Sequence, residues 1–321
     1  MRGTVDPQSN MFSLLSPESV VPKHHPLRAI KKLLDAALHE LSPLFDEMYA
    51  QIGRPSIPPE RLLKAKVLQA LYTIRSEMLL VESLQYNFLF RWFLDLNMTD
   101  PVWDHSTFSK NQQRLLAHRT ADLFFATVVG LAQEHGWVSD EHFSVDGTLI
   151  QAWASLKSFA PRQGAAKKTD DDPGNPSVDF KGQKRRNATH ESTTDPEAQL
   201  MRKGAGQEAR LSYGLHALME NRHGLCVQVE VTLATRTETS ASRELLARQI
   251  DLSPIAPLSV GGDKHFHNKE FVTFCREQGI APHVAQVKER KVAGLDGRTT
   301  GASGYQTSQR IRKRIEEIFG W

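Results

Sequence analysis

Three acidic residues stand out because of the elements in which they lie. Asp146 interrupts residues 143–150, which alternate like a strand, although aspartate is rare in strands. Asp263 follows Val260-Gly-Gly at the C-terminal end of a later short apolar run, where open α/β sheets place their sites. Glu316 lies on a final helical segment. Such oxygen ligands suit two Mg²⁺ or Mn²⁺ ions, which can activate a water or a 3′-hydroxyl and stabilise the leaving oxygen of a phosphodiester.

Glu317 is an alternative to Glu316 as the third carboxylate, and the three acidic residues could also occupy these positions by chance. At 100° per residue, Glu316 lies closer than Glu317 to the edge of the apolar stripe centred on Ile311 and Ile315, and Arg312 lies one turn earlier on the same flank. This geometry favours Glu316 without excluding Glu317. With 37 acidic residues in the chain, chance can also supply three at such positions.

Other residues near the aspartates have two interpretations each. Trp153, seven residues after the first aspartate, is better explained as a core residue than as a platform for a displaced base. Lys264 is either a phosphate contact or an exposed turn residue. His265 and His267 form an H-x-H pattern, but without further Cys or His ligands this pattern does not predict a zinc site.

Positive charge is concentrated locally, because the net charge of the whole chain is only +3. Residues 287–314 carry eight basic side chains against two acidic ones, and residues 181–186 form a second basic run. Such runs are usually solvated surface, but beside a phosphodiester site they favour phosphate contacts. The candidate DNA contacts are Lys264, Arg310, Arg312, Lys313, Arg314, Lys184, Arg185 and Arg186.

The elements that must position these residues divide the chain into parts. After a polar lead-in over residues 1–20, apolar residues recur at helical spacing, which predicts a helical N-terminal domain over 21–136. Pro59 suits the first turn of a helix, and Ser76 and Ser106 suit helix caps. The helices near 76–87 and 106–116 are compatible with a DNA-reading helix-turn-helix or with ordinary solvent-facing helices.

The remaining residues, 137–321, predict an α+β to α/β domain. After the strand at 143–150, strands near 213–219 and 225–231 are joined by the turn at 221–224. A helix, a strand, a helix, a strand and a last helix over 309–319 follow. This order predicts a mixed sheet covered by helices. The polar stretch at about 155–192 lacks apolar periodicity and is expected to be a flexible insertion.

Composition excludes several classes of protein. Two cysteines cannot form a disulfide framework or a Cys-rich zinc site. The apolar runs are far shorter than the ~18 residues of a membrane span, and the N-terminus lacks the apolar core of a signal peptide. We therefore expect a cytoplasmic protein without a membrane partner.

The joint arrangement resembles the DDE transposases, in particular the insertion-sequence-five group. The matching stretches are residues 143–155 around Asp146, 192–198, 214–221, 262–264 around Asp263, and the terminal 312–321 around Glu316. The helical part, from 11–12 through 54–56 to 106–109, is similar to the domain that precedes the RNase H-like core of that family. Together these stretches cover nearly the whole chain.

The terminal motif departs from the family pattern at two positions. That motif reads Tyr, two residues, Arg, three residues, Glu, six residues, Lys. Arg312 and Glu316 fit it, but Gln309 occupies the Tyr position, and the Lys would fall at 323, beyond Trp321. We therefore expect a truncated copy that is weakly active or inactive.

The resemblance implies a catalytic mechanism and its partners. Asp146, Asp263 and Glu316 would hold two Mg²⁺ or Mn²⁺ ions. The protein would cut the ends of a bacterial insertion sequence and join the 3′-hydroxyl to target DNA. A homodimer on double-stranded DNA, associated with the nucleoid, would do this work. The competing hypotheses are an inactive DNA-binding relic or regulator of the same element, and a stand-alone RNase H-like nuclease.

Overall fold

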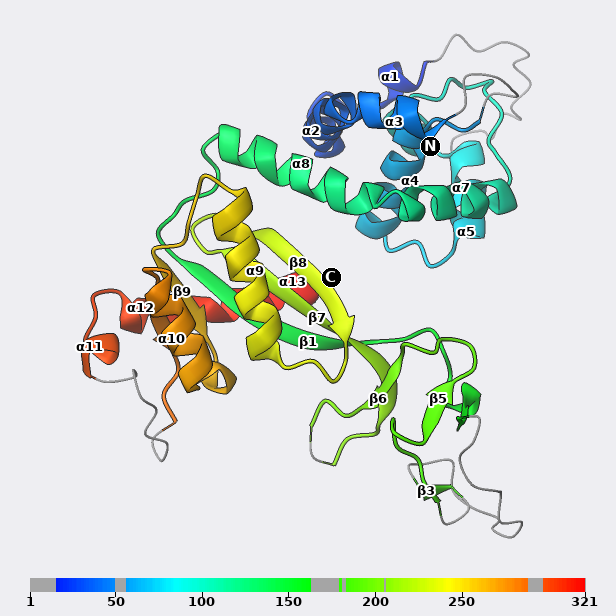
Figure 1. Cartoon of the computed structure of the whole chain (residues 1–321). Helices are drawn as coiled ribbons and strands as arrows, with labels where there is room; N and C mark the ends of the chain where they lie inside the picture. The colour runs from blue at the N-terminus through cyan, green and yellow to red at the C-terminus, as the bar shows by residue number, and fades with distance from the viewer. Residues whose placement is uncertain are drawn as a thin grey trace, which may run out of the picture. The chain divides into compact units, whose positions relative to one another are not determined.

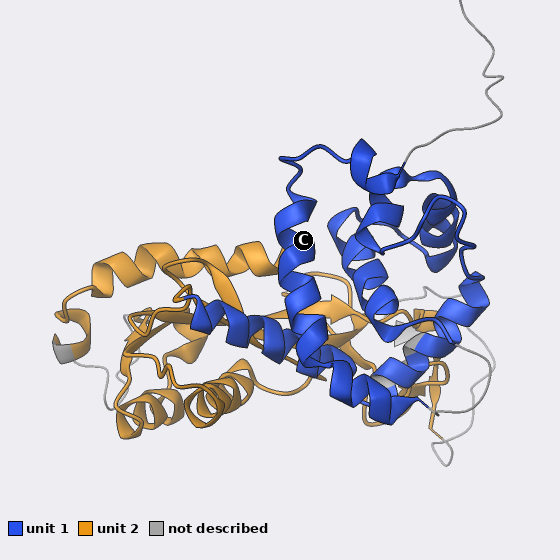
Figure 2. Cartoon of the chain, turned by 90° about the horizontal axis from the view of Figure 1, so that it is seen from above, with its two compact units in different colours: residues 1–135 blue, residues 136–321 orange. Residues whose placement is uncertain are grey.

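The chain forms two compact units, Met1–His135 and Gly136–Trp321, coloured blue and orange in Figure 2. The computed structural model describes residues 16–49, 56–162, 179–180, 183–204, 206–287 and 297–320. Helices make up the regular structure of the described part of the first unit, and the second unit is built on a mixed sheet. This is the fold class that the sequence predicted.

The first unit contains the helices α1 (Pro17–Val20), α2 (Leu27–Glu40), α3 (Ser42–Met48), α4 (Pro59–Leu71), α5 (Glu77–Tyr86), α6 (Phe88–Phe93), α7 (His105–Ala117) and α8 (Thr120–Glu134). Local signals start several of them. Pro59 opens α4, Ser76 Oγ accepts a hydrogen bond from Leu79 N at the start of α5, and Asn87 caps α6. The expected proline and the Ser76 cap are confirmed.

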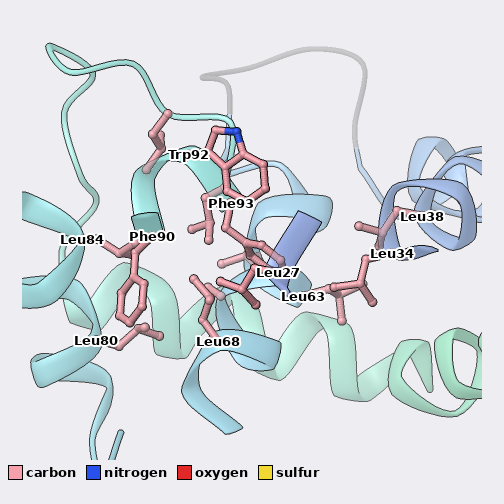
Figure 3. Packing of buried hydrophobic residues seen from close by; sticks show 14 of the residues in the cluster. Leu27, Leu34, Leu38, Leu63, Leu68, Leu80, Leu84, Phe90, Trp92 and Phe93 are labelled. Atoms are coloured by element: carbon pink, nitrogen blue, oxygen red, sulfur yellow. The ribbon is translucent and has the colours of Figure 1, made fainter. Parts of the chain in front are cut away.

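Leucine and aromatic side chains from these helices meet in one core. Leu68, Leu80, Leu84 and Phe93 are fully buried, and Figure 3 shows them together with Trp92 and its neighbours. The apolar residues at three- and four-residue spacing therefore face inward, as the periodicity requires.

One expectation and one of the open alternatives for this unit were wrong. Ser106 does not cap α7, because its backbone N and its hydroxyl both donate to Asp104 Oδ1, one residue before the helix begins. Helices α5 and α7 also do not form a helix-turn-helix. The helix α6 and residues 94–104 separate them, whereas that motif needs a turn of about 3–4 residues. Asn111 of α7 is moreover buried, and its Oδ1 accepts a hydrogen bond from Ser56 Oγ.

The main sheet of the second unit has six strands among the described residues. They are β1 (Phe143–Gln151), β6 (Gln199–Met201), β7 (Arg210–Glu220), β8 (Leu225–Leu233), β9 (Ser259–Gly262) and β10 (Ala281–Val284). The order is β10-β9-β1-β7, and β7 then pairs with β6 over its first residues and with β8 over the rest. β1 runs antiparallel to β7 and parallel to β9. The predicted mixed sheet is confirmed.

Helices cover both faces of this sheet, as Figure 1 shows. They are α9 (Glu238–Leu252), α10 (Lys269–Glu277), α11 (Gly297–Thr300) and the terminal segment of α12 (Tyr305–Ile311), a 3₁₀ turn (Arg312–Ile315) and α13 (Glu316–Phe319). α9 packs on β7 and β8 on one face. On the other face, Ile315 of the terminal segment packs against Ala217 and Met219 of β7.

The predicted insertion between about 155 and 192 contains regular structure in its described part. After a 3₁₀ turn (Leu156–Ser158), β2 (Phe159–Pro161) pairs with β5 (His190–Ser192), and β3 (Asp179–Phe180) pairs with β4 (Gln183–Lys184). Phe159 is buried with Leu211 in a small cluster. The sequence did not indicate these strands, because each is only two or three residues long. Residues 163–178 and 181–182 lie outside the described part.

Within the described residues, no single helix is both long and apolar enough to cross a membrane. The bent pair His105–Leu115 and Thr120–Glu134 meets that criterion by length and composition only.

Candidate active site

The sheet register brings the two aspartates to the same level. Phe143 pairs with Val260 and Ser144 with Gly261 in the parallel ladder of β1 and β9, so the same register continued puts Asp146 opposite Asp263. Neighbouring strands lie about 4.8 Å apart. Asp263 immediately follows β9, and its Oδ1 accepts a hydrogen bond from His265 N at 2.7 Å. Both carboxylates therefore lie at one edge of the domain core.

Asp146 is half-buried and lies among other charges. Its Oδ1 accepts a hydrogen bond from Gly147 N at 2.8 Å. Burial raises the pKa of the Asp146 carboxyl, and the negative charges of Asp263 and Glu316 raise it further, whereas the Arg312 guanidinium opposes this shift. The three predicted carboxylates are therefore near enough to interact electrostatically.

The terminal segment distinguishes the two candidates for the third carboxylate. Glu316 and Glu317 are both exposed at the start of α13, but of these two only Glu316 contributes to the pKa shift of Asp146. The buried Ile315, one residue earlier, fixes this turn on β7. Gln309, at the position of the expected Tyr, donates from Nε2 to His283 O at 2.6 Å and so attaches the segment to β10.

A fourth carboxylate, Glu238, belongs to the same cluster. The ligand atoms of Glu238, Asp263 and His265 all lie within 4.8 Å of one another. Burial raises the pKa of Glu238, as do the charges of Asp146 and Asp263, while His265 opposes the shift. Sequence reasoning missed Glu238 because an acidic residue in the first turn of a helix is common for electrostatic reasons alone.

Trp153 differs from its expected role, and the two histidines of the H-x-H pattern have different surroundings. Trp153 is not a core residue: its side chain is 100% exposed just beyond β1, so the expectation of core packing was wrong. His265 and His267 do not share a ligand site, because His267 is buried and its Nδ1 accepts a hydrogen bond from Val287 N at 2.9 Å. His265 instead lies 3.2 Å from Asp263, measured from Nδ1 to Oδ2.

The candidate DNA contacts fall into three groups. Lys264, Arg310, Lys313 and Arg186 are exposed. Arg312, Arg314 and Arg185 are partly buried; Arg314 donates to Asn221 O at 3.0 Å and Arg185 to Leu156 O at 3.2 Å. The side chain of Lys184 and residues 288–296 of the basic segment lie outside the described part of the chain.

The donor set fits a divalent cation of the magnesium type. Carboxylate oxygens dominate it, and hard oxygen ligands are those that Mg²⁺ and Mn²⁺ prefer. A single imidazole, that of His265, adjoins them. Thiolate does not contribute, because Cys275 is buried in α10 and Cys226 lies within β8. The site is thus suited to metal-assisted chemistry at a phosphate.

Comparison with known families agrees with this fold. Residues 139–321 match the family described as Transposase DDE domain, and residues 15–114 match the one described as Transposase domain (DUF772). The chain therefore belongs to the DDE transposase family. Its second unit is an RNase H-like transposase core preceded by a helical region.

Solved structures of transposases resemble the chain only distantly. One is the piggyBac transposase synaptic complex with hairpin DNA, at 11% identity and a TM-score of 0.32 over 81% of this chain and 50% of that one. Another is the Mos1 transposase paired-end complex with the left transposon end, at 9% identity and a TM-score of 0.22 over 92% of this chain and 96% of that one. The chain thus spans half the length of the piggyBac protein. No match was found among curated proteins.

Proposed function

We propose that this protein is the transposase of a bacterial insertion sequence of the insertion-sequence-five group. It cuts DNA at the ends of its element and joins the freed 3′-hydroxyl to target DNA. The observation that carries the proposal is the grouping of Asp146, Asp263 and Glu316 at one edge of a transposase core. The protein works as a homodimer on double-stranded DNA, in the cytoplasm at the nucleoid.

In this proposal, separate residues of the chain bind the metal ions and the scissile phosphate. Asp146 and Asp263 would hold two Mg²⁺ or Mn²⁺ ions, with Glu316 as a further ligand of the second. Bound there, such ions would supply activation of the attacking oxygen and stabilisation of the leaving oxygen. Arg312, whose charge acts on Asp146, is the proposed contact to the scissile phosphate. Since the attacking group is water or a 3′-hydroxyl, no protein nucleophile is required.

Strand transfer tests this function directly. Duplexes ending in the DNA that flanks the coding sequence are incubated with supercoiled target DNA and the full chain, with Mg²⁺, with Mn²⁺ or with EDTA. We expect metal-dependent joined products, and their loss in Asp146→Asn and Asp263→Asn. Asp251→Asn, exposed near the end of α9, is the matched control.

The competing functions give different products in the same assay. Cleavage without joining would indicate a stand-alone nuclease. Specific binding to the end duplex without cleavage in either metal would indicate a regulator. Unchanged joining by the two aspartate variants would contradict the proposed site.

A further inference from the structure

We propose that Glu238 is a fourth carboxylate of this metal centre and that it holds one divalent cation together with Asp263 and His265. The inference rests on the proposed function and extends it. It assigns a ligand that the three-carboxylate motif lacks and that comes from α9, on the face of the sheet opposite Glu316.

The three side chains surround one common point. His265 Nδ1 lies 3.5 Å from Glu238 Oε2 and 3.2 Å from Asp263 Oδ2, and one ligand atom from each residue lies within 4.8 Å of the others. At metal–oxygen distances of about 2.0–2.6 Å, two ligands of one ion are roughly 3–5 Å apart. The cluster therefore matches a cation's shell with little rearrangement.

The position of Glu238 in the first turn of α9 does not by itself explain where its side chain lies. The helix is already capped by Thr237, whose Oγ1 accepts a hydrogen bond from Ser240 N at 3.3 Å. An acidic residue that served only the helix dipole could remain in solvent. Glu238 is instead half-buried, and its Cγ lies 3.0 Å from the point where a Cβ at Gly147 would stand. Its side chain therefore lies over the strand that carries Asp146.

A buried histidine lies next to Glu238 beneath α9. His216 of β7 pairs with Gly147 and is 2% exposed; its Nε2 is 3.0 Å from Thr232 Oγ1. Its Nδ1 has no hydrogen-bond partner among the described residues, and it lies 2.8 Å from the same Cβ position at Gly147. Buried imidazole nitrogens are normally paired. This nitrogen and Glu238 Cγ therefore both lie close to the Cβ position at Gly147, but His216 is outside the cluster in which the ligand atoms of Glu238, Asp263 and His265 lie within 4.8 Å of one another.

Glycine at position 147 keeps that space open. Any side chain there would meet His216 Nδ1 at 2.8 Å and Glu238 Cγ at 3.0 Å. The backbone at this position is ordinary strand, so the glycine is required by the close approach of these two groups. Gly147 thus lets a histidine and a carboxylate from two elements reach one point next to Asp146.

The test is Mn²⁺ binding by the metal-free full-length protein, measured by electron paramagnetic resonance and calorimetry. Glu238→Gln should weaken binding of one ion about tenfold or more. Glu244→Gln is the matched control, because Glu244 lies on the same helix, is exposed and pairs with Arg236. It should bind Mn²⁺ like the wild type. Gly147→Ala, which crowds Glu238 without removing a carboxylate, should also weaken binding.

The outcomes separate this inference from the proposed function. Wild-type Mn²⁺ binding by a folded Glu238→Gln protein would overturn the role of Glu238, and loss of binding and strand transfer in Asp263→Asn would still support the transposase. If the wild type itself bound no Mn²⁺, both proposals would fall. The unfolding temperature of each variant, measured in EDTA, checks that it is folded. If Glu238→Gln unfolds at a much lower temperature than the wild type, Glu238→Asp replaces it. This variant keeps the negative charge on a shorter side chain and must show reduced Mn²⁺ affinity.

Discussion

Arg312 Nε donates a hydrogen bond to Gln309 Oε1 at 3.2 Å, one turn earlier on the terminal segment. Because Gln309 also donates to His283 O of β10, the amide connects the sheet to the guanidinium whose charge acts on Asp146. Glutamine thus provides a link between strand and arginine at the position where the related motif has tyrosine.

This link predicts how the charge on Asp146 responds to substitution. Arg312→Gln removes a cation that lowers the pKa of Asp146, so the pKa should rise further above its ordinary value. Gln309→Ala should act in the same direction but less, since the guanidinium remains. Carboxyl-selective ¹³C titration of the metal-free protein measures this pKa. Arg310→Gln, exposed on the same segment, should leave it unchanged, and equal effects of the two arginine variants would disprove a specific role for Arg312.

The raised pKa of Asp146 also predicts a stability effect in EDTA. Because the folded protein binds this proton more tightly than the unfolded chain, where the aspartate pKa is about 3.9, stability falls as pH rises between the two values. Above the pKa of Asp146 in the folded protein, the loss of stability caused by the charged carboxylate no longer changes with pH. Asp146→Asn should therefore melt at a higher temperature than the wild type at pH 7.5, by about 2–4 °C for each kcal/mol removed.

Metal should reverse that order of stability. Mn²⁺ should raise the melting temperature of the wild type and have less effect on Asp146→Asn, since only the wild type keeps both aspartates. Asp251→Asn should follow the wild type in both conditions. A lower melting temperature of Asp146→Asn in EDTA would contradict the crowding of negative charge around this carboxyl.

The full exposure of Trp153 predicts a role in binding rather than in stability. Stacking on an unpaired base contributes about 1–3 kcal/mol, roughly a 5–150-fold change in affinity. Trp153→Ala should therefore bind end duplexes with unpaired terminal bases more weakly, while its melting temperature stays the same. Trp153→Phe should retain most of the affinity. Equal weakening on fully paired DNA would show that stacking is not the cause.

The exposed cations of the terminal segment predict a salt effect. Arg310→Gln with Lys313→Gln should lower the slope of log K against log salt by about 0.9 for each phosphate that is no longer neutralised. Arg314→Gln should change the slope less and the stability more, because its guanidinium is bonded to Asn221 O. Binding of end duplexes measured from 50 to 300 mM salt, roughly the range in which such slopes develop, provides the comparison.

The sequence predicted the core strands because their signals are local. Alternating apolar residues and the turn at 221–224, where Gly224 has φ of +77°, specify the β7–β8 hairpin without knowledge of the rest of the fold. Local signals also singled out Asp146 and Asp263 as candidates, since Asp146 lies within its strand and Asp263 directly follows its own. Helix α9 was also expected, since a helix was predicted to follow the hairpin.

Other features depend on contacts distant in sequence. Glu238 joins the site only because α9 packs on the sheet. Trp153 is exposed because no other described part of the chain packs over it. The helix-turn-helix hypothesis failed because α6 is too short to give a clear periodicity, so its presence between α5 and α7 was not apparent. Short strands such as β2 and β5 lack a period for the same reason.

The parallel ladder of β1 and β9 comprises only the pairs Phe143–Val260 and Ser144–Gly261. The two strands therefore stop sharing backbone hydrogen bonds two residues before they reach Asp146 and Asp263. A longer ladder would fix these carboxylates at the spacing of neighbouring strands, whereas the open end leaves their separation to be set by whatever lies between them. The pairing of β1 with β9 thus ends before both aspartates, while β1 remains paired with β7 as far as Gln151, so bound ions would be free to set the distance between the two carboxylates.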